Sequence, residues 1–365
     1  AAAACGAAAA LTACGGSSAS TATSTTTEAT SEAAASTSGS KTDVAFVTDV
    51  GNIDDQSFNQ YTWQGVQDFC SANSLNANYY RPTEDSDAAR LEQMDNAVND
   101  GAKSIVVAGY LFGNAIAEAQ GKYPDVQFLA LDVSASDLGD KAPTANTALI
   151  TYKEEQAGYL AGYAAVYDGY KELGFLGGMA VPAVIRYGYG FVQGADAAAK
   201  ELGVKVDMNY SWQYGASFSA SPELQTMVSG WYEAGTEVVF ACGGSMFASV
   251  AAAAGAADGK VVGVDVDQST ESDTVITSAM KGLADSVQWA LGKFYSNEFA
   301  SIGGVGTSLG ANENAVGLPT ATWSLTKWTV DEYNTMLKDI VGGKITIDSD
   351  YNNLKSTDNV TLNII

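Results

Sequence analysis

The chain has 365 residues, 46% of them hydrophobic, which is enough for two domains with substantial cores. Its formal net charge is −24, which excludes the basic surface that nucleic acid or anionic lipid would require. The sequence contains no histidine, which excludes Ser-His-Asp and Cys-His catalysis and histidine-ligated zinc but leaves enzymes that work with carboxylates, lysine or tyrosine.

The first forty residues form two stretches of different composition. Residues 1–14 are mostly small and apolar, and residues 15–40 are rich in Ser, Thr and Ala with no aromatic or basic residue. The second stretch has too little apolar surface to offset its ordering entropy, so we expect a flexible tether. Residues 11–15 resemble a bacterial lipobox, in which Cys14 would carry the lipid. The leader has no basic residue, and an Ala-rich leader without a lipid is the alternative.

No later segment has the roughly 20 consecutive apolar residues of a transmembrane helix, so we expect membrane attachment by lipid alone. Among the four cysteines, Cys5, Cys14, Cys70 and Cys242, no pair has metal-site spacing. We therefore expect no metal and no cofactor. Cys70 and Cys242 end a helix pattern and a strand pattern, which predicts small buried hydrophobic side chains.

From residue 41 onward, short apolar runs alternate with longer amphipathic ones. This alternation predicts βαβ units, with parallel strands and helices on both faces of the sheet. The strand-like runs are Val44–Asp49, Ser104–Gly109, Gln127–Asp132, Ala148–Tyr152, Gly174–Gly177, Val204–Tyr210, Val238–Cys242 and Val261–Val266. The helix-like runs are 56–72, 86–99, 113–121, 154–167, 188–202, 222–234 and 246–257.

About ten such units are too many for one sheet of ordinary size, so we predict an α/β fold with two lobes. After residue 267 the pattern changes to a strand at 275–280, a helix at 283–297, a Gly-rich loop at 303–310, a segment at 320–328 and a helix at 330–341. Late segments of this kind suit a chain that crosses back between lobes. The predicted N-terminal lobe comprises residues 41–150 and about 268–300. The predicted C-terminal lobe comprises residues 151–267 and about 301–365.

Polar residues and glycines follow the predicted strands in both lobes. Ligands of open α/β sheets bind beyond the carboxyl ends of the strands. A glycine there lets the backbone approach a ligand, and an aspartate offers two acceptor oxygens. The sequence therefore predicts a cleft between the lobes, at strand ends that carry Asp49, Gly109, Asp132, Gly177, Cys242, Gly243, Gly244 and Asp265.

Two aromatic residues have positions from which they could reach this cleft. Phe58 falls in the first turn of a predicted helix, at the strand-end edge, and core packing is equally compatible with its spacing. Phe218 lies in a loop after a strand. One aromatic ring from each lobe would form a sandwich for a flat ring. Asp54 and Asp55 precede the helix, and we expect them to cap its N-terminus.

Several segments resemble the basic membrane protein (BMP/Med) family, the purine-nucleoside-binding lipoproteins of ABC importers. The resemblance covers roughly residues 42–345, and its most specific motifs are VTDVGNIDDQSFNQYTWQG at 47–65 and VVGVDVDQS at 261–269. It implies the α/β type I periplasmic-binding-protein fold, with two Rossmann-like lobes joined by three crossovers and a ligand cleft between them. It also implies a lipid-anchored protein on the extracytoplasmic face of the cell membrane, which binds a nucleoside and docks on an ABC permease, as a monomer.

The resemblance also implies roles for individual residues. Phe58 and Phe218 would stack on the two faces of the base, and Asp49 and Asn59 would hydrogen-bond the ligand. Asp265 would accept hydrogen bonds from ribose hydroxyls, and Lys281 would donate to the sugar. Gly243 and Gly244 would line the wall of the ligand site. The chain departs from the family at Ser245-Met246 and at residues 219–221, which leaves the choice between purine and pyrimidine open.

Two other classes of function stay open. A calcium-dependent nucleoside hydrolase also has an Asp- and Gly-rich loop after its first strand. Here, however, Val47 stands where the first Asp of that motif belongs, and an extra residue separates Gly51 from Asp54-Asp55. The second class is a sensor or binding protein for another small molecule, such as a sugar or an autoinducer, because this fold hosts many ligands.

Overall fold

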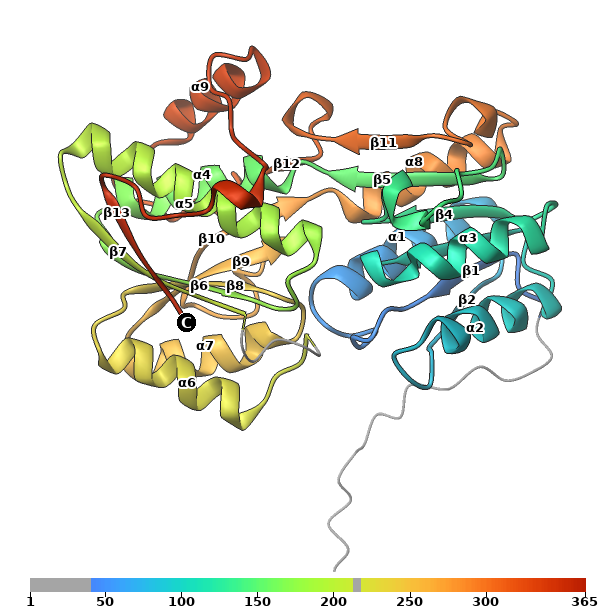
Figure 1. Cartoon of the computed structure of the whole chain (residues 1–365), viewed down its shortest axis with the longest axis horizontal. Helices are drawn as coiled ribbons and strands as arrows, with labels where there is room; N and C mark the ends of the chain where they lie inside the picture. The colour runs from blue at the N-terminus through green and yellow to red at the C-terminus, as the bar shows by residue number, and fades with distance from the viewer. Residues whose placement is uncertain (1–40, 213–217) are drawn as a thin grey trace, which may run out of the picture. The chain divides into compact units, whose positions relative to one another are not determined.

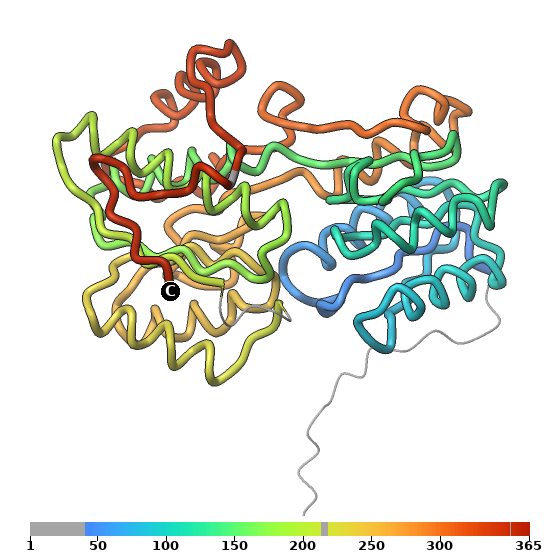
Figure 2. Tube along the Cα trace, viewed as in Figure 1, coloured from blue at the N-terminus to red at the C-terminus, as the bar shows by residue number. Residues whose placement is uncertain are grey.

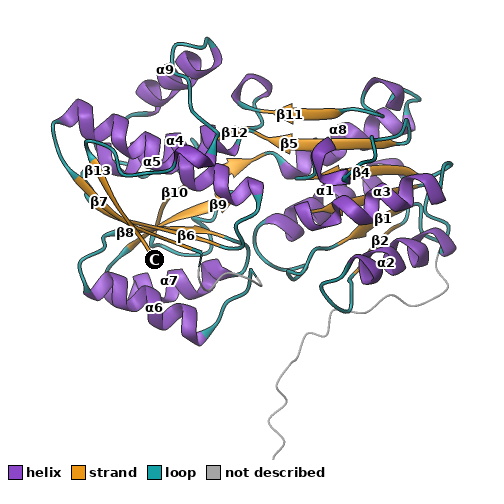
Figure 3. Cartoon of the chain, in the orientation of Figure 1, coloured by secondary structure: helices purple, strands orange, loops and turns teal. Residues whose placement is uncertain are grey.

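Two parallel-stranded sheets organise the computed structural model, which describes residues 41–212 and 218–365 (Figures 1 and 3). The described residues belong to one compact unit. The first sheet has the order β11-β5-β4-β3-β1-β2, and every neighbouring pair is parallel. Its strands are β1 (Val44–Val47), β2 (Ala77–Tyr80), β3 (Ser104–Ala108), β4 (Gln127–Leu131), β5 (Thr147–Tyr152) and β11 (Gly306–Leu309).

The second sheet has the order β12-β10-β9-β8-β6-β7-β13, in which only the β10–β12 pair is antiparallel within the described residues. Its strands are β6 (Glu172–Gly177), β7 (Val206–Ser211), β8 (Val238–Cys242), β9 (Lys260–Asp265), β10 (Val275–Lys281), β12 (Val316–Gly317) and β13 (Val360–Ile364). Central strands such as β8 are buried along their whole length, as expected where helices cover both faces.

Helices cover both faces of each sheet. They are α1 (Phe58–Asn73), α2 (Asp87–Asn99), α3 (Gly113–Lys122), α4 (Glu154–Tyr167), α5 (Pro182–Leu202), α6 (Pro222–Glu233), α7 (Met246–Ala257), α8 (Leu283–Tyr295) and α9 (Val330–Val341). Short 3-10 turns occur at Tyr110–Phe112, Ala135–Leu138, Phe299–Ser301, Ala311–Glu313 and Tyr351–Asn353. In the second sheet α4 and α5 lie on one face and α6 and α7 on the other (Figure 1).

The hydrophobic core follows this layering. One cluster lies between the first sheet and helices α2 and α3, and another lies between the second sheet and helices α6 and α7. A third cluster is continuous across the remaining faces of both sheets and includes residues of α1, α8, α4 and α5. The two sheets with their helices, which we call the first and second lobes, therefore share one core cluster.

The chain passes between the lobes three times, from β5 to α4, from β10 to α8 and from β11 to β12 (Figure 2). This connectivity differs from the predicted lobe boundaries at two strands. β10 lies within the range 268–300 assigned to the N-terminal lobe, but it pairs with β9 in the second sheet. β11 lies within the range 301–365 assigned to the C-terminal lobe, but it pairs with β5 in the first. Both strands lie next to a crossover. There the order of elements along the chain does not indicate which of the two sheets a strand will join.

Most predicted elements are present, with differences at their ends. The predicted helices at 154–167, 246–257 and 330–341 match α4, α7 and α9 at both ends. Four strands were not predicted: β2, β11, β12 and β13. Residues 320–328 contain neither helix nor strand. The thiols of Cys70 and Cys242 are free and buried, which confirms their prediction as buried side chains. Burial raises the pKa of Cys70 to about 11.

Candidate functional site

The carboxyl ends of strands from both sheets meet at one pocket. It contains about 630 Å³ of space not filled by atoms, part of it open to solvent. All eight residues predicted to bind ligand line this pocket: Asp49, Phe58, Asn59, Phe218, Gly243, Gly244, Asp265 and Lys281. They come from the ends of β1, β8, β9 and β10, from the start of α1 and from the loop before α6. The polar residues at the predicted strand ends therefore do lie around a pocket. Their roles in binding a ligand stay predictions.

The loop between β1 and α1 is held by Asp55, whose side chain is buried. Its Oδ1 accepts hydrogen bonds from the backbone N–H groups of Ser57 and Gln60, at 2.9 and 3.0 Å. Its Oδ2 accepts from the backbone N–H of Asn59 at 2.9 Å. The N-cap residue is Ser57, so Asp55 accepts these N–H groups at the start of α1 from two positions before the cap, and neither predicted aspartate is itself the N-cap or a first-turn acid. Asp54 is exposed. Burial raises the pKa of Asp55 to about 7, against the lowering effect of these hydrogen bonds.

Asp49 and Asn59 form a second polar group beside this cap. Asp49 Oδ1 accepts from the Gly51 backbone N–H and from Asn59 Nδ2, both at 2.7 Å. Asn59 Nδ2 also donates to Asp55 Oδ2 at 3.1 Å. Burial raises the pKa of Asp49, and the hydrogen bonds from Asn59 and Gly51 oppose this rise. One amide thus joins two carboxylates at the pocket wall.

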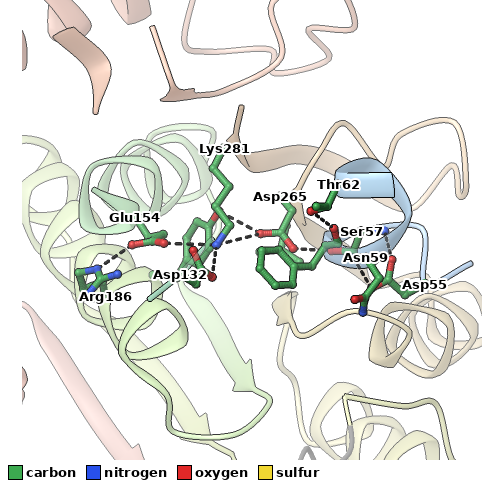
Figure 4. Close-up of polar contacts among 12 residues, drawn as sticks. Asp55, Ser57, Asn59, Thr62, Asp132, Glu154, Arg186, Asp265 and Lys281 are labelled. Carbon is green, nitrogen blue, oxygen red and sulfur yellow. Dashed lines mark hydrogen bonds and ion pairs between the residues drawn. The ribbon is translucent and has the colours of Figure 1, made fainter. Parts of the chain in front are cut away.

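Lys281 lies at the centre of a buried ionic cluster at the crossovers (Figure 4). Its Nζ is 2.7 Å from Asp132 Oδ2, 3.3 Å from Glu154 Oε1 and 3.9 Å from Asp265 Oδ1. Glu154 also pairs with Arg186, at 2.6 Å. Burial alone would lower the pKa of Lys281, but the three carboxylates raise it above its ordinary value. Lys281 is therefore charged, and its charge is already shared among three acids.

The Lys281 ammonium also lies over aromatic rings. It is 4.8 Å from the centroid of Phe58, 5.2 Å from that of Tyr152 and 5.7 Å from that of Tyr187. Contacts of this length are attractive because the ring faces are electron-rich. The half-buried Phe58 ring is thus fixed near one end of the pocket.

Asp265 connects the lobes. Its Oδ2 accepts from Ser57 Oγ of the first lobe at 2.6 Å, and its Oδ1 accepts from Tyr187 Oη at 3.3 Å. Its φ of 67° lies in the left-handed region and directs the chain out of β9. Burial raises the pKa of Asp265, and Lys281 is the largest influence in the opposite direction.

The opposite wall consists of Phe218 and glycines. A Cβ on Gly178 would overlap the Phe218 ring, and one on Gly243 would lie 3.1 Å from it. Glycine at these two positions therefore lets this half-buried ring lie close to the backbone that follows β6 and β8. Gly244 has a φ of 49°, a second conformation that favours glycine.

Sequence reasoning missed four residues of the site. Asp132 was noted as a strand-end aspartate but not assigned to the site. Its Oδ1 is buried without a hydrogen-bond partner among the described residues. Tyr187 lines the pocket from α5, but the helix was predicted to begin only at 188, so this residue was read as loop. Glu154 and Arg186 gave no signal, because a charge pair between distant segments has no local pattern in the sequence.

Neither a metal-binding cluster nor a membrane-spanning helix is present in residues 41–212 and 218–365. No cluster of three or more His, Cys, Asp or Glu side chains there has the arrangement of a metal site. None of the helices in these residues is long and apolar enough to cross a membrane.

Comparisons with known proteins agree with this architecture. Residues 42–350 match the family model described as "ABC transporter substrate-binding protein PnrA-like". The "ABC transporter nucleoside-binding protein BmpA" of Lactococcus lactis is 28% identical over 339 residues, which cover 86% of this chain and 92% of that one. A Pyrococcus furiosus protein described as an uncharacterized lipoprotein is 25% identical, covering 77% of this chain and 71% of that one.

Among solved structures, an ABC transporter solute-binding protein from Aeropyrum pernix superposes with a TM-score of 0.72 at 20% identity, covering 84% of this chain and 93% of that one. At this identity the likeness concerns the fold, which is the type I fold of periplasmic solute-binding proteins. The predicted fold class is confirmed.

Proposed function

The chain belongs to the family of PnrA-like ABC transporter substrate-binding proteins, and on that premise we propose that it captures nucleosides, purine nucleosides first, for an ABC importer. The observation that carries the proposal is the pair of aromatic rings. Phe58 from the first lobe and Phe218 from the second line one pocket that also has carboxylates at its walls. Flat heteroaromatic rings gain stacking energy between two such faces.

Within this proposal, the two polar groups of the pocket serve different parts of the ligand. Asp265, Lys281 and Asp132 would meet the ribose, because closely spaced carboxylates accept from vicinal hydroxyls and the lysine donates. Asp49 would meet the base at the other end of Phe58. Gly243 and Gly244 would leave room for the ligand by having no side chain.

The proposed mechanism is hinge closure without chemistry. A nucleoside enters between open lobes, and closure buries it. The closed monomer then docks on a permease whose partner subunits hydrolyse ATP. The proposed location is the extracytoplasmic face of the cell membrane, with a lipid on Cys14, a residue outside the described part of the chain. The lipoprotein description of the Pyrococcus furiosus relative supports this anchor.

The two alternatives have less support. Catalysis by a calcium-loaded loop would require the Asp54-Asp55 pair to face a metal. Instead, Asp54 is exposed and Asp55 accepts four N–H groups of its own loop and helix. Capture of a sugar or an autoinducer by a sensor would use the same concavity, and aromatic rings also stack on sugars. The family match to transporter components favours delivery to an importer.

Calorimetric titration of the chain with adenosine, guanosine, inosine, uridine, cytidine and ribose tests the proposal. We expect purine nucleosides to bind and ribose to bind far more weakly. Binding of a sugar without binding of any nucleoside would overturn it. Incubation with inosine and calcium, followed by an assay for free ribose, tests the hydrolase alternative.

The variant Phe58→Ala tests the stacking role. We expect it to weaken nucleoside binding by at least about 1 kcal/mol, the typical gain of an aromatic pair beyond burial. Trp289→Ala is the matched control, since this exposed aromatic side chain lies on α8 and does not line the pocket. Equal affinities of Phe58→Ala and the unmodified chain would assign Phe58 to the core instead.

A further inference from the structure

Asn59 has no hydrogen-bond donor left for a ligand. A side-chain amide carries two N–H groups, and Asn59 donates one to Asp49 Oδ1 at 2.7 Å and one to Asp55 Oδ2 at 3.1 Å. Its own Oδ1 accepts from the Asp49 backbone N–H at 3.3 Å. Asn59 is also buried. It lines the pocket, but its amide is fully engaged by its neighbours.

The two carboxylates that Asn59 joins, those of Asp49 and Asp55, differ in how many hydrogen bonds they can still accept. Asp55 accepts four hydrogen bonds, two on each oxygen, which fills the acceptor sites of a carboxylate. Asp49 accepts two bonds on Oδ1 and, within the described part of the chain, none on Oδ2. Asp49 is half-buried and lines the pocket. Oδ2 of Asp49 is therefore the open acceptor of this group.

The position of Phe58 places this acceptor at one end of a stacked ring. The Cα of Gly109 lies beside both Asp49 and the Phe58 ring: a Cβ built there would be 3.3 Å from Asp49 Cβ and 3.8 Å from Phe58 Cε1. Lys281, with Asp132 and Asp265, lies 4.8 Å from the Phe58 centroid. Asp49 and Lys281 therefore both lie beside the Phe58 ring, and the pose we consider is a base stacked on this ring with its sugar toward Lys281 and its far edge toward Asp49.

We propose that Asn59 is a positioning residue that fixes which oxygen of Asp49 faces the pocket, and that Asp49 Oδ2 selects a base whose far edge carries an N–H donor. This inference rests on the proposed function. A ring whose edge has only acceptor nitrogens would place a nitrogen lone pair against a lone pair of Asp49 Oδ2. The two atoms would repel each other and neither would have a hydrogen bond, so the affinity would be lower. The favoured chemical class is a 6-oxopurine or another nucleobase with a ring or amino N–H at that edge.

Two nucleosides of nearly equal shape test this selection without any variant. Inosine carries an N–H on its six-membered ring, whereas purine riboside presents only acceptor nitrogens there. Calorimetric titration of the full chain should give an affinity for inosine at least about tenfold higher, since an unmade buried hydrogen bond has a penalty of that order. Equal affinities for the two nucleosides would overturn the inference while leaving nucleoside capture intact. Binding of neither would overturn both.

The variant Asp49→Asn tests the fixed orientation. Gly51 and Asn59 both donate to the Oδ1 position, so the new amide must keep its oxygen there and turn its NH₂ toward the ligand. The ratio of the two affinities should fall to about one or invert. Asp68→Asn makes the same chemical change at an exposed position of α1 and should leave both affinities and the ratio unchanged. An unchanged ratio in Asp49→Asn would contradict the inference.

Adding Asn59→Ala to Asp49→Asn tests the positioning role. Without Asn59 only the Gly51 N–H still holds the oxygen of the new amide, so the amide rotates more easily and part of the preference for inosine should return. If Asn59 had a purely structural role, the added change would lower the affinities for inosine and purine riboside equally. The ratio of the two affinities would then stay at its value in Asp49→Asn.

Discussion

At the residue scale, the pocket combines excess negative charge with the burial of most of the groups that carry it. Among the described residues, Asp49, Asp55, Asp132 and Asp265 line it together with one ammonium, that of Lys281. Buried carboxylates are costly unless they are paired or accept hydrogen bonds. Each aspartate here has such a partner, and Lys281 alone contacts two of the four. The pocket thus depends on one cation and on a set of well-placed N–H and O–H donors.

Lys281→Met should destabilise the fold strongly. It removes the cation from three carboxylates while keeping a side chain of similar length, so those charges stay buried without compensation. We expect a loss of about 3–5 kcal/mol in the free energy of unfolding, measured by urea denaturation. Lys344→Met is the control. The Lys344 side chain is 75% exposed and pairs with Asp339 at the surface, where a loss of about 1 kcal/mol or less is expected. Similar losses in the two variants would contradict the account of the cluster.

Glu155 makes the stability of the protein depend on pH. Burial raises its pKa to about 7, and its Oε2 has no hydrogen-bond partner among the described residues. Because the folded pKa lies above the ordinary value of 4.5, the folded state binds more protons than the unfolded state between these two values. Stability should therefore increase as the pH falls from about 7 toward 4.5.

Glu155→Gln removes this contribution. At pH 8 we expect the variant to be more stable by about 1–3 kcal/mol and its melting temperature to vary less between pH 5 and 8. Glu118→Gln, an exposed change on α3, should leave the melting curve at each pH as it was. Loss of stability in Glu155→Gln at pH 8 would mean that the pairing of Glu155 with Arg186, at 3.9 Å, outweighs burial.

The candidate site could be predicted from the sequence only in part. Strand-end position was enough to indicate Asp49 and Asp265, because parallel strands bring such residues to one edge. The partners of each side chain were not predictable. Asn59 was expected to touch ligand, yet its amide is occupied by Asp49 and Asp55. Hydrogen-bond saturation depends on loop geometry, which no periodic pattern encodes.

At the element scale, glycines decide how α4 and α5 pack. Gly158 and Gly162 of α4 lie against the backbone of α5, and Gly190 and Gly194 of α5 lie against the backbone of α4. These glycines bring two helices close together and carry both Glu154 and Tyr187 to the pocket. The predicted helix began at 188, so the first turns of α5 were missed although Pro182 at the first helical position is a start signal.

Gly162→Ala should lower stability by about 2 kcal/mol or more. Its Cβ would overlap the Phe191 carbonyl oxygen, and a backbone atom cannot rotate away as a side chain can. Gly255→Ala is the matched control within α7, since a Cβ there meets nothing within 4 Å. That change should stabilise by about 0.5–1 kcal/mol through helix propensity. Thermal denaturation of both variants would show opposite shifts, and a stabilised Gly162→Ala would contradict the close helix packing.

At the whole-molecule scale, the lobes are linked by crossovers and by hydrogen bonds across the pocket. Ser57 donates to Asp265, Gln268 donates to the backbone oxygen of Gln56, and Gln56 donates to Glu271. The sequence predicted two lobes because repeated strand–helix units exceeded one sheet. It did not place β10 and β11, since pairing at a sheet edge depends on which edge is open after the chain crosses. The hydrogen bonds across the pocket indicate a closed arrangement.

Ser57→Ala should shift this closed arrangement toward open lobes. The change removes one donor from Asp265 and leaves its contacts with Tyr187 and Lys281, so the second lobe keeps its own structure. A single hydrogen bond to a charged group contributes about 1.5–3 kcal/mol, which is enough to change the closed population severalfold or more. Small-angle X-ray scattering of the ligand-free variant should give a larger radius of gyration than the unmodified chain.

Saturating nucleoside should restore the smaller radius, because a ligand held by both lobes favours closure by its differential affinity for the closed state. The apparent affinity should fall in proportion to the lost closed population. Ser301→Ala is the control: Ser301 is exposed in the turn after α8 and donates to the backbone oxygen of Glu298 within the same turn. If Ser57→Ala changed neither the radius nor the affinity, the three crossovers and the shared core would hold the lobes closed without the polar contacts. Binding would then require an opening motion elsewhere in the second lobe.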